Sequence, residues 1–246
     1  MNGDPSYEAR TTRRAVALLV ERYQLGFGRL ELRQSVDVPI GCGFGASAAS
    51  ALSAVYAVAS AVGLRAPKSA IARCAYDAEI IEQTGLGTVS VTYDGYGAGA
   101  ITEPGEPGVA RFITVRVPGT VRLVTASFAP IEKRNAISTA ETAQRIVKLG
   151  DEALGRFLAG PTLEELASLG EWFTEQLGIA TAEVRRMANA AKAAGALYAS
   201  QNMMGHAVHA VTLEGSAERV VKALTAAGPN PRIDVFEVGS VKAGPF

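Results

Sequence analysis

Three alternating glycines are the residues of this chain best placed to do chemistry. Residues 38–52 read VPIGCGFGASAASAL, so Gly41, Gly43 and Gly45 precede a run of small, uncharged residues. Glycine lets the backbone take positive φ angles and approach a ligand without a Cβ clash. The start of a helix adds free N–H groups and a partial positive charge. A glycine loop ahead of a helix therefore predicts a phosphate-binding site.

The sequence of this loop differs from those of two well-known phosphate-binding loops. It contains no Gly-Lys followed by Ser or Thr, which a Walker A loop requires. Its spacing, Gly-x-Gly-x-Gly, also differs from the Gly-x-Gly-x-x-Gly fingerprint of dinucleotide-binding proteins. The simplest alternative to a phosphate site is a glycine-rich turn that leads into a buried helix.

The elements expected to position this loop are a strand before it and helices around it. Apolar residues from Leu30 to Val38 alternate with polar ones, which predicts a half-buried strand over 28–37. The charge-free run after the loop predicts a helix over 46–62, and an amphipathic pattern predicts another over 10–23. A further helix is expected from Ser69, as its N-cap, to about Gln83. Short strands are expected at 88–93, 97–103, 111–117 and 120–127.

After Pro130 the pattern becomes mostly helical, so a domain border is expected near 128–136. Thr162 and Glu165 form a capping-box pattern at the start of one of these helices. The remaining expected elements are helices at 136–158, 162–177 and 181–194, a strand at 207–213, a helix at 216–227 and a strand at 232–238.

Composition excludes several classes of protein. The 246 residues suffice for one large or two small domains, and 48% of them are hydrophobic. A net charge of zero argues against a nucleic-acid binder. Cys42 and Cys74 are too few for a disulfide framework and are expected to be buried thiols in a reducing cytoplasm. The uncharged stretch 38–64 is too rich in glycine, alanine and serine for a membrane span.

The loop resembles the signature of the GHMP small-molecule kinases, Pro-x-x-x-Gly-Leu-Gly-Ser-Ser-Ala-Ala, which here runs from Pro39 to Ala49. The variant Gly-Phe-Gly-Ala-Ser is most similar to archaeal pantoate kinases. The resemblance extends to Ala75–Thr88, to the turn Glu103–Gly108 and to Ser200–Val208. It implies a two-domain α+β fold. Residues 1–130 would form the ATP-binding domain without its first strands, and residues 131–246 a ferredoxin-like C-terminal domain.

The resemblance also implies roles for single residues, with ATP and Mg²⁺ as cofactors. Ser47 and Glu79 are the implied Mg²⁺ ligands, although Ser47 could simply cap its helix and Glu79 could be a solvated carboxylate. Glu82 and Asp77 are the alternatives to Glu79. The implied phosphate-binding positions are Pro39, Gly41, Gly43, Phe44, Gly45, Ala46, Ser47 and Ala48.

Two positions depart from the pantoate kinase pattern. Thr88 occupies the place of the Asp that orients the attacking hydroxyl, and Ala100–Glu103 lacks the expected Arg. The resemblance implies an ATP-dependent kinase that phosphorylates pantoate to 4-phosphopantoate in archaeal coenzyme A biosynthesis. It would act in the cytoplasm on a small molecule, without nucleic acid or membrane and with a possible homodimer. The alternatives are a kinase for another hydroxy acid or alcohol, and a non-catalytic nucleotide-binding paralogue.

Overall fold

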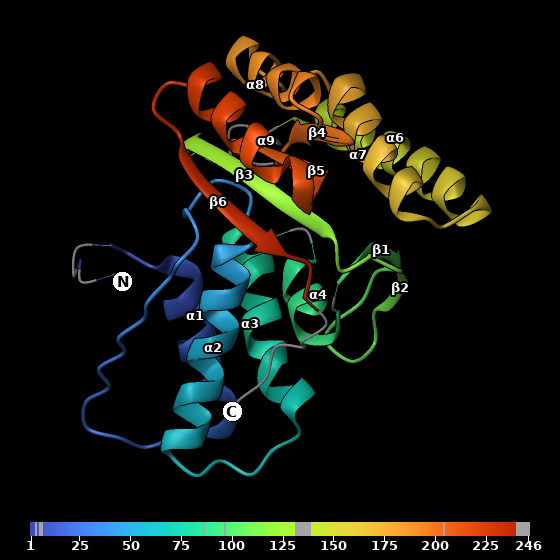
Figure 1. The fold of residues 1–246 in the computed structure, drawn as a ribbon. Coiled ribbons are helices and arrows are strands. Elements are labelled where there is room, and N and C mark those ends of the chain that lie inside the picture. Colours follow the sequence, from blue (N-terminus) through green and yellow to red (C-terminus); the bar gives the residue numbers. More distant parts are fainter. Residues whose placement is uncertain are drawn as a thin grey trace.

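A cluster of helices and an antiparallel sheet make up most of the molecule (Figure 1). The computed structural model describes residues 1–2, 4, 7–85, 87–95, 97–130, 139–203 and 205–239. The helical cluster consists of α1 (Arg10–Tyr23), α2 (Ala46–Ala61), α3 (Lys68–Glu82) and α4 (Thr88–Asp94). In Figure 1 the sheet lies across the end of this cluster and separates it from the later helices.

Helix α2 lies at the centre of the helical cluster. Most of its side chains are Ala, Ser or Val, and ten of its 16 residues are buried. Small side chains let neighbouring helices approach closely, so α1, α3 and α4 all pack against it. The amphipathic helix α1 contributes Ala15 and Leu19, which are fully buried beside Val55 of α2. This packing fixes the start of α2, where the glycine loop ends.

The main sheet is antiparallel, with the strand order β4-β5-β3-β6. Its strands are β3 (Val121–Ala129), β4 (Tyr198–Gln201), β5 (His206–Leu213) and β6 (Arg232–Glu237). Helices α8 (Ala182–Ala193) and α9 (Glu214–Ala227) cover one face, while α6 (Ala140–Ala159) and α7 (Leu163–Leu177) pack side by side next to β4. A separate hairpin joins β1 (Ala98–Glu103) and β2 (Arg111–Val115).

Strand β3 lies before the expected domain border but belongs to the main sheet. It pairs with β5 on one side and β6 on the other. From β3 onward the elements run strand, helices, strand, strand, helix, strand, and the first and third strands occupy the middle of the sheet. This order agrees with the ferredoxin-like expectation. Residues 131–138, directly after the expected border, lie outside the described part of the chain, and with them lie the first three residues of the helix expected at 136–158.

The structure differs from the sequence expectation in several further places, one of which is the unexpected strand β4. Residues 28–37 are extended but join no ladder with any described residue, because no neighbouring strand lies beside them. Residues 88–94 form helix α4 instead of a strand. The β-branched residues there favoured a strand locally, but Gly87, with a φ of 89°, starts a helix that buries Val89 and Ser90. Helix α3 begins at Lys68 with Pro67 as its N-cap, so Ser69 is not the cap.

Other local expectations are confirmed. Thr162 caps α7, because its hydroxyl oxygen accepts a hydrogen bond from the backbone N–H of Glu165 at 3.1 Å. Cys42 and Cys74 are both buried free thiols. Among the described residues, no helix has both the length and the apolar character needed to cross a bilayer.

Candidate phosphate-binding site

The glycine loop, residues 39–45, has the backbone conformation that its sequence requires. Gly41, Gly43 and Gly45 have φ angles of 79°, 81° and 70°. A side chain is strained at such angles. Two of the glycines also lie close to other elements. A Cβ on Gly41 would lie 2.6 Å from the Cβ of Pro130, and one on Gly45 would lie 3.0 Å from a methyl carbon of Thr88. The loop thus packs where only glycine fits.

The first turn of α2 presents unpaired backbone donors directly after the loop. Gly45 is the N-cap, and the first intrahelical bond runs from the N–H of Ala49 to the carbonyl of Gly45. The N–H groups of Ala46, Ser47 and Ala48 therefore have no partner within the helix. No acidic residue occupies this turn to compensate the positive end of the helix dipole. This end of the helix suits an anion such as a phosphate.

Ser47 and Glu79 meet beside this helix start. The Ser47 hydroxyl donates to Oε1 of Glu79 at 3.2 Å, although 32 residues separate the two in sequence. Glu79 is only 2% exposed. A buried carboxylate next to a hydroxyl provides two of the oxygen ligands that Mg²⁺ prefers, and phosphate oxygens and water can supply the rest. No group of three or more His, Cys, Asp or Glu side chains that could hold a metal occurs in the described part of the chain.

The backbone that follows α3 encloses the Glu79 carboxylate. The N–H of Val89 donates to its Oε2 at 3.3 Å. A Cβ on Gly85 would lie 2.0 Å from the same oxygen, so the chain passes Glu79 too closely for any side chain. A buried carboxylate must be hydrogen-bonded or matched by a positive charge. The enclosure therefore holds the carboxyl group of Glu79 in place beside the helix start.

The alternatives to Glu79 lie elsewhere on α3. Asp77 accepts hydrogen bonds from Arg22 at 2.8 Å and from Arg73 at 3.2 Å. Glu82 forms an ion pair with Arg14 at 3.1 Å. Both carboxylates are thus held by arginines in partly exposed ion pairs, and neither is bonded to Ser47.

Thr88 lies against the glycine loop as the first residue of α4. The contact with Gly45 described above brings its side chain to the loop, and its own carbonyl accepts from the Thr92 hydroxyl at 2.8 Å. A hydroxyl at this position can donate or accept a hydrogen bond, but it cannot take a proton at neutral pH. The structure therefore brings Ser47, Glu79 and Thr88 around one helix start.

The main sheet holds the glycine loop from the other side. The side-chain amide of Asn202 donates to the carbonyl of Cys42 at 3.0 Å, across 160 residues of sequence. His209 of β5 lies 2.9 Å from the Asn202 carbonyl oxygen through its Nδ1. Gly205 completes this contact, because a Cβ there would lie 2.4 Å from the Cα of Cys42. Asn202, Gly205 and His209, hereafter the loop clamp, hold the middle of the glycine loop.

Burial keeps the side chains behind the loop neutral. It raises the pKa of the Cys42 thiol, which donates to the carbonyl of Ala129 at 3.4 Å. It lowers the pKa of His209, and the negative charge of Glu171 acts in the opposite direction. Because Oδ1 of Asn202 can only accept, Nδ1 of His209 carries the proton in this hydrogen bond. A neutral histidine with its proton on Nδ1 thus supports the loop.

Comparison with protein families identifies the region that contains this site. Residues 10–95, which contain α1 to α4 and the glycine loop, match the family model of the GHMP kinases N terminal domain. This region therefore belongs to the GHMP kinase N-terminal domain family. The glycine loop, the start of α2 and the Ser47–Glu79 pair all lie within it.

Two archaeal proteins similar to this chain are described as pantoate kinase. The protein from Methanospirillum hungatei is 29% identical over 185 residues, which make up 75% of this chain and 60% of that protein. The protein from Thermococcus kodakarensis is 28% identical over 229 residues, or 91% of this chain and 73% of that protein. The chain therefore spans 60% of the length of the first of these relatives.

Solved structures show that the α+β fold of the GHMP kinases extends over nearly the whole chain. A structure described as a phosphotransferase related to the CoA biosynthesis pathway matches 98% of this chain and 78% of its own, with a TM-score of 0.78 and 23% identity. The mevalonate kinase of Methanococcus jannaschii matches the same shares with a TM-score of 0.65 and 18% identity. At these identities the likeness concerns the fold.

Sequence reasoning missed the residues that support the site. Neither Gly85 nor the loop clamp was expected to touch it, and His209 was expected only as part of the strand at 207–213. The segment Ser200–Val208 did stand out by its resemblance, but nothing local in it indicates contact with Cys42. The one sequence feature that could have indicated this contact is the presence of Asn202 and Gly205 in a turn between two short strands.

Proposed function

We propose that this chain is an ATP- and Mg²⁺-dependent kinase that phosphorylates a hydroxyl group of a small molecule, with pantoate as the favoured acceptor. The observation that carries the proposal is the glycine loop with three positive φ angles, ending at a helix start where Ser47 meets the buried Glu79. The similarity to two archaeal proteins described as pantoate kinases supports pantoate.

Each part of the site has a role in this reaction. ATP with Mg²⁺ supplies the phosphoryl group and neutralises charge on it. The glycine loop leaves room for phosphate oxygens at the N–H groups of Ala46, Ser47 and Ala48. Ser47 and Glu79 offer oxygens to the metal, and the enclosure by Gly85 and Val89 keeps the carboxylate from turning away.

A non-catalytic nucleotide-binding protein is the second candidate, and Thr88 favours it. No carboxylate stands at the position expected to orient the attacking hydroxyl, and Ala100–Glu103 of β1 carries no cation for a substrate carboxylate. Phosphoryl transfer depends mainly on positioning and charge stabilisation, so a missing base alone lowers the rate without abolishing it.

We also propose different roles for the helical cluster and the main sheet. The helical cluster supplies the phosphate site, and the main sheet supplies the loop clamp. We place the border between them near Gly119, ahead of β3, because among the described strands β3 pairs only with β5 and β6.

Two measurements test the function. In an ADP-release assay across pantoate, homoserine, shikimate and mevalonate, turnover is expected with pantoate first. In calorimetry, Gly43→Val is expected to abolish ATP binding, since a branched side chain at a φ of 81° would distort the loop where phosphate must approach. Unchanged ATP affinity in that variant would overturn the phosphate site. ATP binding without turnover on any acceptor would favour the second candidate.

A magnesium titration tests the metal ligands. Ser47→Ala and Glu79→Gln are each expected to weaken Mg²⁺-dependent ATP binding about ten-fold or more, with little change in metal-free binding. Glu82→Gln is the matched control, because it removes a carboxylate of the same helix that is paired with Arg14. Equal titration curves for Glu79→Gln and wild type would remove Glu79 from the site.

A further inference from the structure

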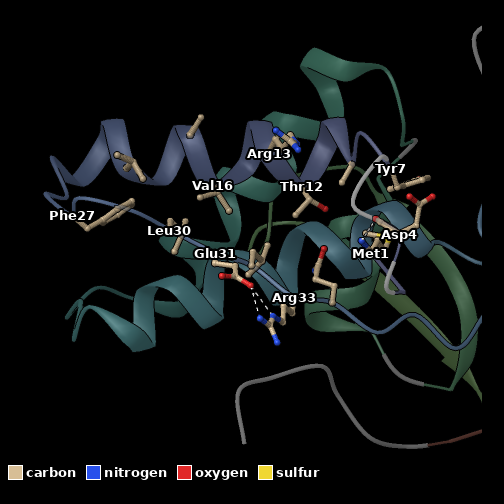
Figure 2. Close-up of a pocket in the computed structure, with 15 residues that line it drawn as sticks. Met1, Asp4, Tyr7, Thr12, Arg13, Val16, Phe27, Leu30, Glu31 and Arg33 are labelled. Carbon is tan, nitrogen blue, oxygen red and sulfur yellow. Dashed lines mark hydrogen bonds and ion pairs between the residues drawn. The ribbon is translucent and has the colours of Figure 1, made fainter.

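Pockets of different character open on the described structure outside the phosphate site. A groove of about 840 Å³ lies between α1 and the extended residues 27–34 (Figure 2). Its walls mix apolar residues such as Phe27 with charged ones such as Glu31 and Arg33. A pocket of about 380 Å³, hereafter the sheet pocket, lies instead between α7, the main sheet and the start of β1. The walls of the sheet pocket are therefore held by paired strands and a packed helix.

The walls of the sheet pocket are mostly apolar. Strands β3 and β5 turn one face toward α8 and α9, where Val124 and Ala210 are fully buried. Side chains alternate between the two faces of a strand, so Leu123, His209 and Val211 lie on the other face and line the pocket. The facing wall on α7 consists of Leu163, Leu166, Ala167 and Gly170. A space with such walls holds water poorly and favours an apolar molecule.

The charged residues at the sheet pocket are already paired. Arg122 lies 2.9 Å from Glu214 and 3.4 Å from Glu237, and it donates to the carbonyl of Gly119 at 2.6 Å. The lining residues that the structure describes include no lysine and no other arginine. A buried phosphate or carboxylate needs a positive partner. The sheet pocket therefore suits neither a nucleotide phosphate nor an acidic acceptor.

His209 gives this pocket a polar atom with a defined role. Its Nδ1 donates to Oδ1 of Asn202 at 2.9 Å, so the neutral ring carries no proton on Nε2. Burial keeps the ring neutral by lowering its pKa. Nε2 lies on a different edge of the ring, and no residue in the described part of the chain forms a hydrogen bond with it. The pocket thus matches an apolar molecule with a hydroxyl or amide N–H group that donates to Nε2.

The same histidine connects the sheet pocket with the glycine loop. The Asn202 amide, which accepts from His209, donates to the Cys42 carbonyl at 3.0 Å. A trans peptide is planar, so the N–H of Gly43 points away from the side on which Asn202 holds that carbonyl. Hydrogen bonds in a chain polarise one another, so a donor on Nε2 would make the Nδ1–H group a stronger donor. An occupant of the pocket would therefore tighten the hold on the loop.

We propose that the sheet pocket is a regulatory site for an uncharged, mainly apolar small molecule whose hydroxyl or amide N–H donates to Nε2 of His209, and that its occupancy strengthens nucleotide binding at the glycine loop. A volume of about 380 Å³ is in the range of small-molecule sites. By linkage, the nucleotide strengthens binding at the pocket by the same factor. The regulatory effect rests on the proposed function, whereas binding in the pocket does not.

Cyclohexylmethanol and its methyl ether form a probe pair, because the ether has a similar apolar body but no donor. In NMR titrations of the full chain without nucleotide, the alcohol should shift the resonances of Leu163, Leu166 and Val211 with an affinity in the millimolar range. The ether should bind about ten-fold more weakly. The alcohol should also shift the amide resonance of Gly43. In calorimetry, saturating alcohol should tighten ATP binding about five-fold.

A pocket-filling variant locates the binding of the alcohol. Gly170→Leu should fill the sheet pocket without touching the loop clamp, because a Cβ on Gly170 meets no atom within 4 Å. It should abolish alcohol binding and the effect of the alcohol on ATP, while ATP alone binds as in wild type. Gly150→Leu is the matched control, since Gly150 is an equally open glycine on α6 and does not line the pocket. Circular dichroism checks that both variants fold.

Each part of the proposal has an outcome that would overturn it. No alcohol binding, or equal binding to Gly170→Leu and wild type, would overturn the site. Equal affinities for the alcohol and the ether would overturn the role of His209. Alcohol binding that changes neither the Gly43 resonance nor the ATP affinity would overturn the regulation. A chain that binds the alcohol but no ATP would instead contradict the proposed function, and the Gly43 resonance then decides whether the pocket and the loop are coupled.

Discussion

The glycine loop and the extended segment before it are neighbours in sequence, but the rest of the chain holds only one of them firmly. The loop contacts Pro130 after β3, Thr88 of α4, and Asn202 and Gly205 from the turn between β4 and β5. Residues 27–33 make no backbone hydrogen bond in the described structure. The sequence of each region predicts its local backbone structure clearly. Local sequence therefore does not indicate which of the two regions is held by contacts with the rest of the chain.

The two regions differ in how their backbone conformations are stabilised. The conformation of a glycine loop follows from local backbone preferences, and neighbours that pack on the loop make its position more precise. An extended segment has its hydrogen-bonding groups directed sideways, so its structure depends on a partner strand. We expect substitutions near the loop to alter binding and turnover, and substitutions near the segment to have small effects on the stability of one chain.

The largest effect is expected from Thr88→Asp, which tests whether the firmly held region lacks only a base. A general base contributes about 10²–10⁴-fold to a proton transfer, so turnover should rise by that order if acceptor binding is intact. ATP affinity should change much less, because the base acts on the attacking hydroxyl.

Thr88→Asn is the matched control for this change, because it has the same shape without the ability to take a proton. The ADP-release assay compares the three proteins. No gain with Thr88→Asp while ATP still binds would count against an active enzyme and in favour of the non-catalytic candidate.

Gly205→Ala should produce the next largest effect, since it adds a methyl group 2.4 Å from the Cα of Cys42. The glycine loop or the turn must shift, and overpacking of this kind costs about 1–3 kcal/mol of folding free energy. A shifted loop should also weaken ATP binding about ten-fold. Gly215→Ala is the control, because nothing lies within 4 Å of a Cβ there. Equal ATP affinities for the two variants would mean that the clamp does not position the loop.

His209 should give a smaller, pH-dependent effect. Burial lowers its pKa in the folded protein below the ordinary value near 6.5, so the unfolded chain takes up a proton first as the pH falls. Its contribution to the free energy of unfolding is therefore complete above about pH 6.5 and is lost as the pH falls through the folded-state pKa.

Urea unfolding of wild type and His209→Gln at about pH 8 and about pH 5 measures this loss. The variant should lose less stability on acidification than wild type. His206→Gln serves as the control, since its ring contacts Phe128 rather than the clamp. A wild-type loss that His209→Gln fails to reduce would refute the linkage.

The smallest effect is expected from Asn2→Ala in the loosely held region. The substitution removes only the exposed side-chain hydrogen bonds to Val36, so the free energy of unfolding should fall by about 0.5 kcal/mol or less. The amide hydrogen of Val36 should exchange faster in the variant, which hydrogen exchange at low protein concentration can measure. A loss of several kcal/mol would show that Asn2 stabilises more than this edge.

The sequence predicted what depends on local patterns. Helices α1 and α2, the Thr162 cap and the turn at Glu103–Gly108 all follow from residues that are close together in the chain. The prediction of a strand at 88–93 was wrong. The β-branched residues there favour a strand locally, but packing on α2 and α3 stabilises a helix instead.

The site itself was predictable only in part. Ser47 and Glu79 could be named as candidates, but their 3.2 Å contact joins residues on two helices, and no spacing rule predicts it. The bond from Asn202 to Cys42 spans 160 residues and depends on how the main sheet meets the helical cluster. Contacts of this kind arise from the assembled fold, so a single sequence carries no direct sign of them.

The position of β3 in the chain has a consequence for synthesis. Helices α1 to α4 have their mutual partners within residues 10–94 and can pack while translation continues. Strand β3 must wait for β5 and then for β6 at residues 232–237 before both of its edges are paired. The clamp on Cys42 forms in the same late step, because it needs Asn202, Gly205 and His209. A growing polypeptide would thus hold its glycine loop in the final position only near the end of folding, long after the loop itself has left the ribosome.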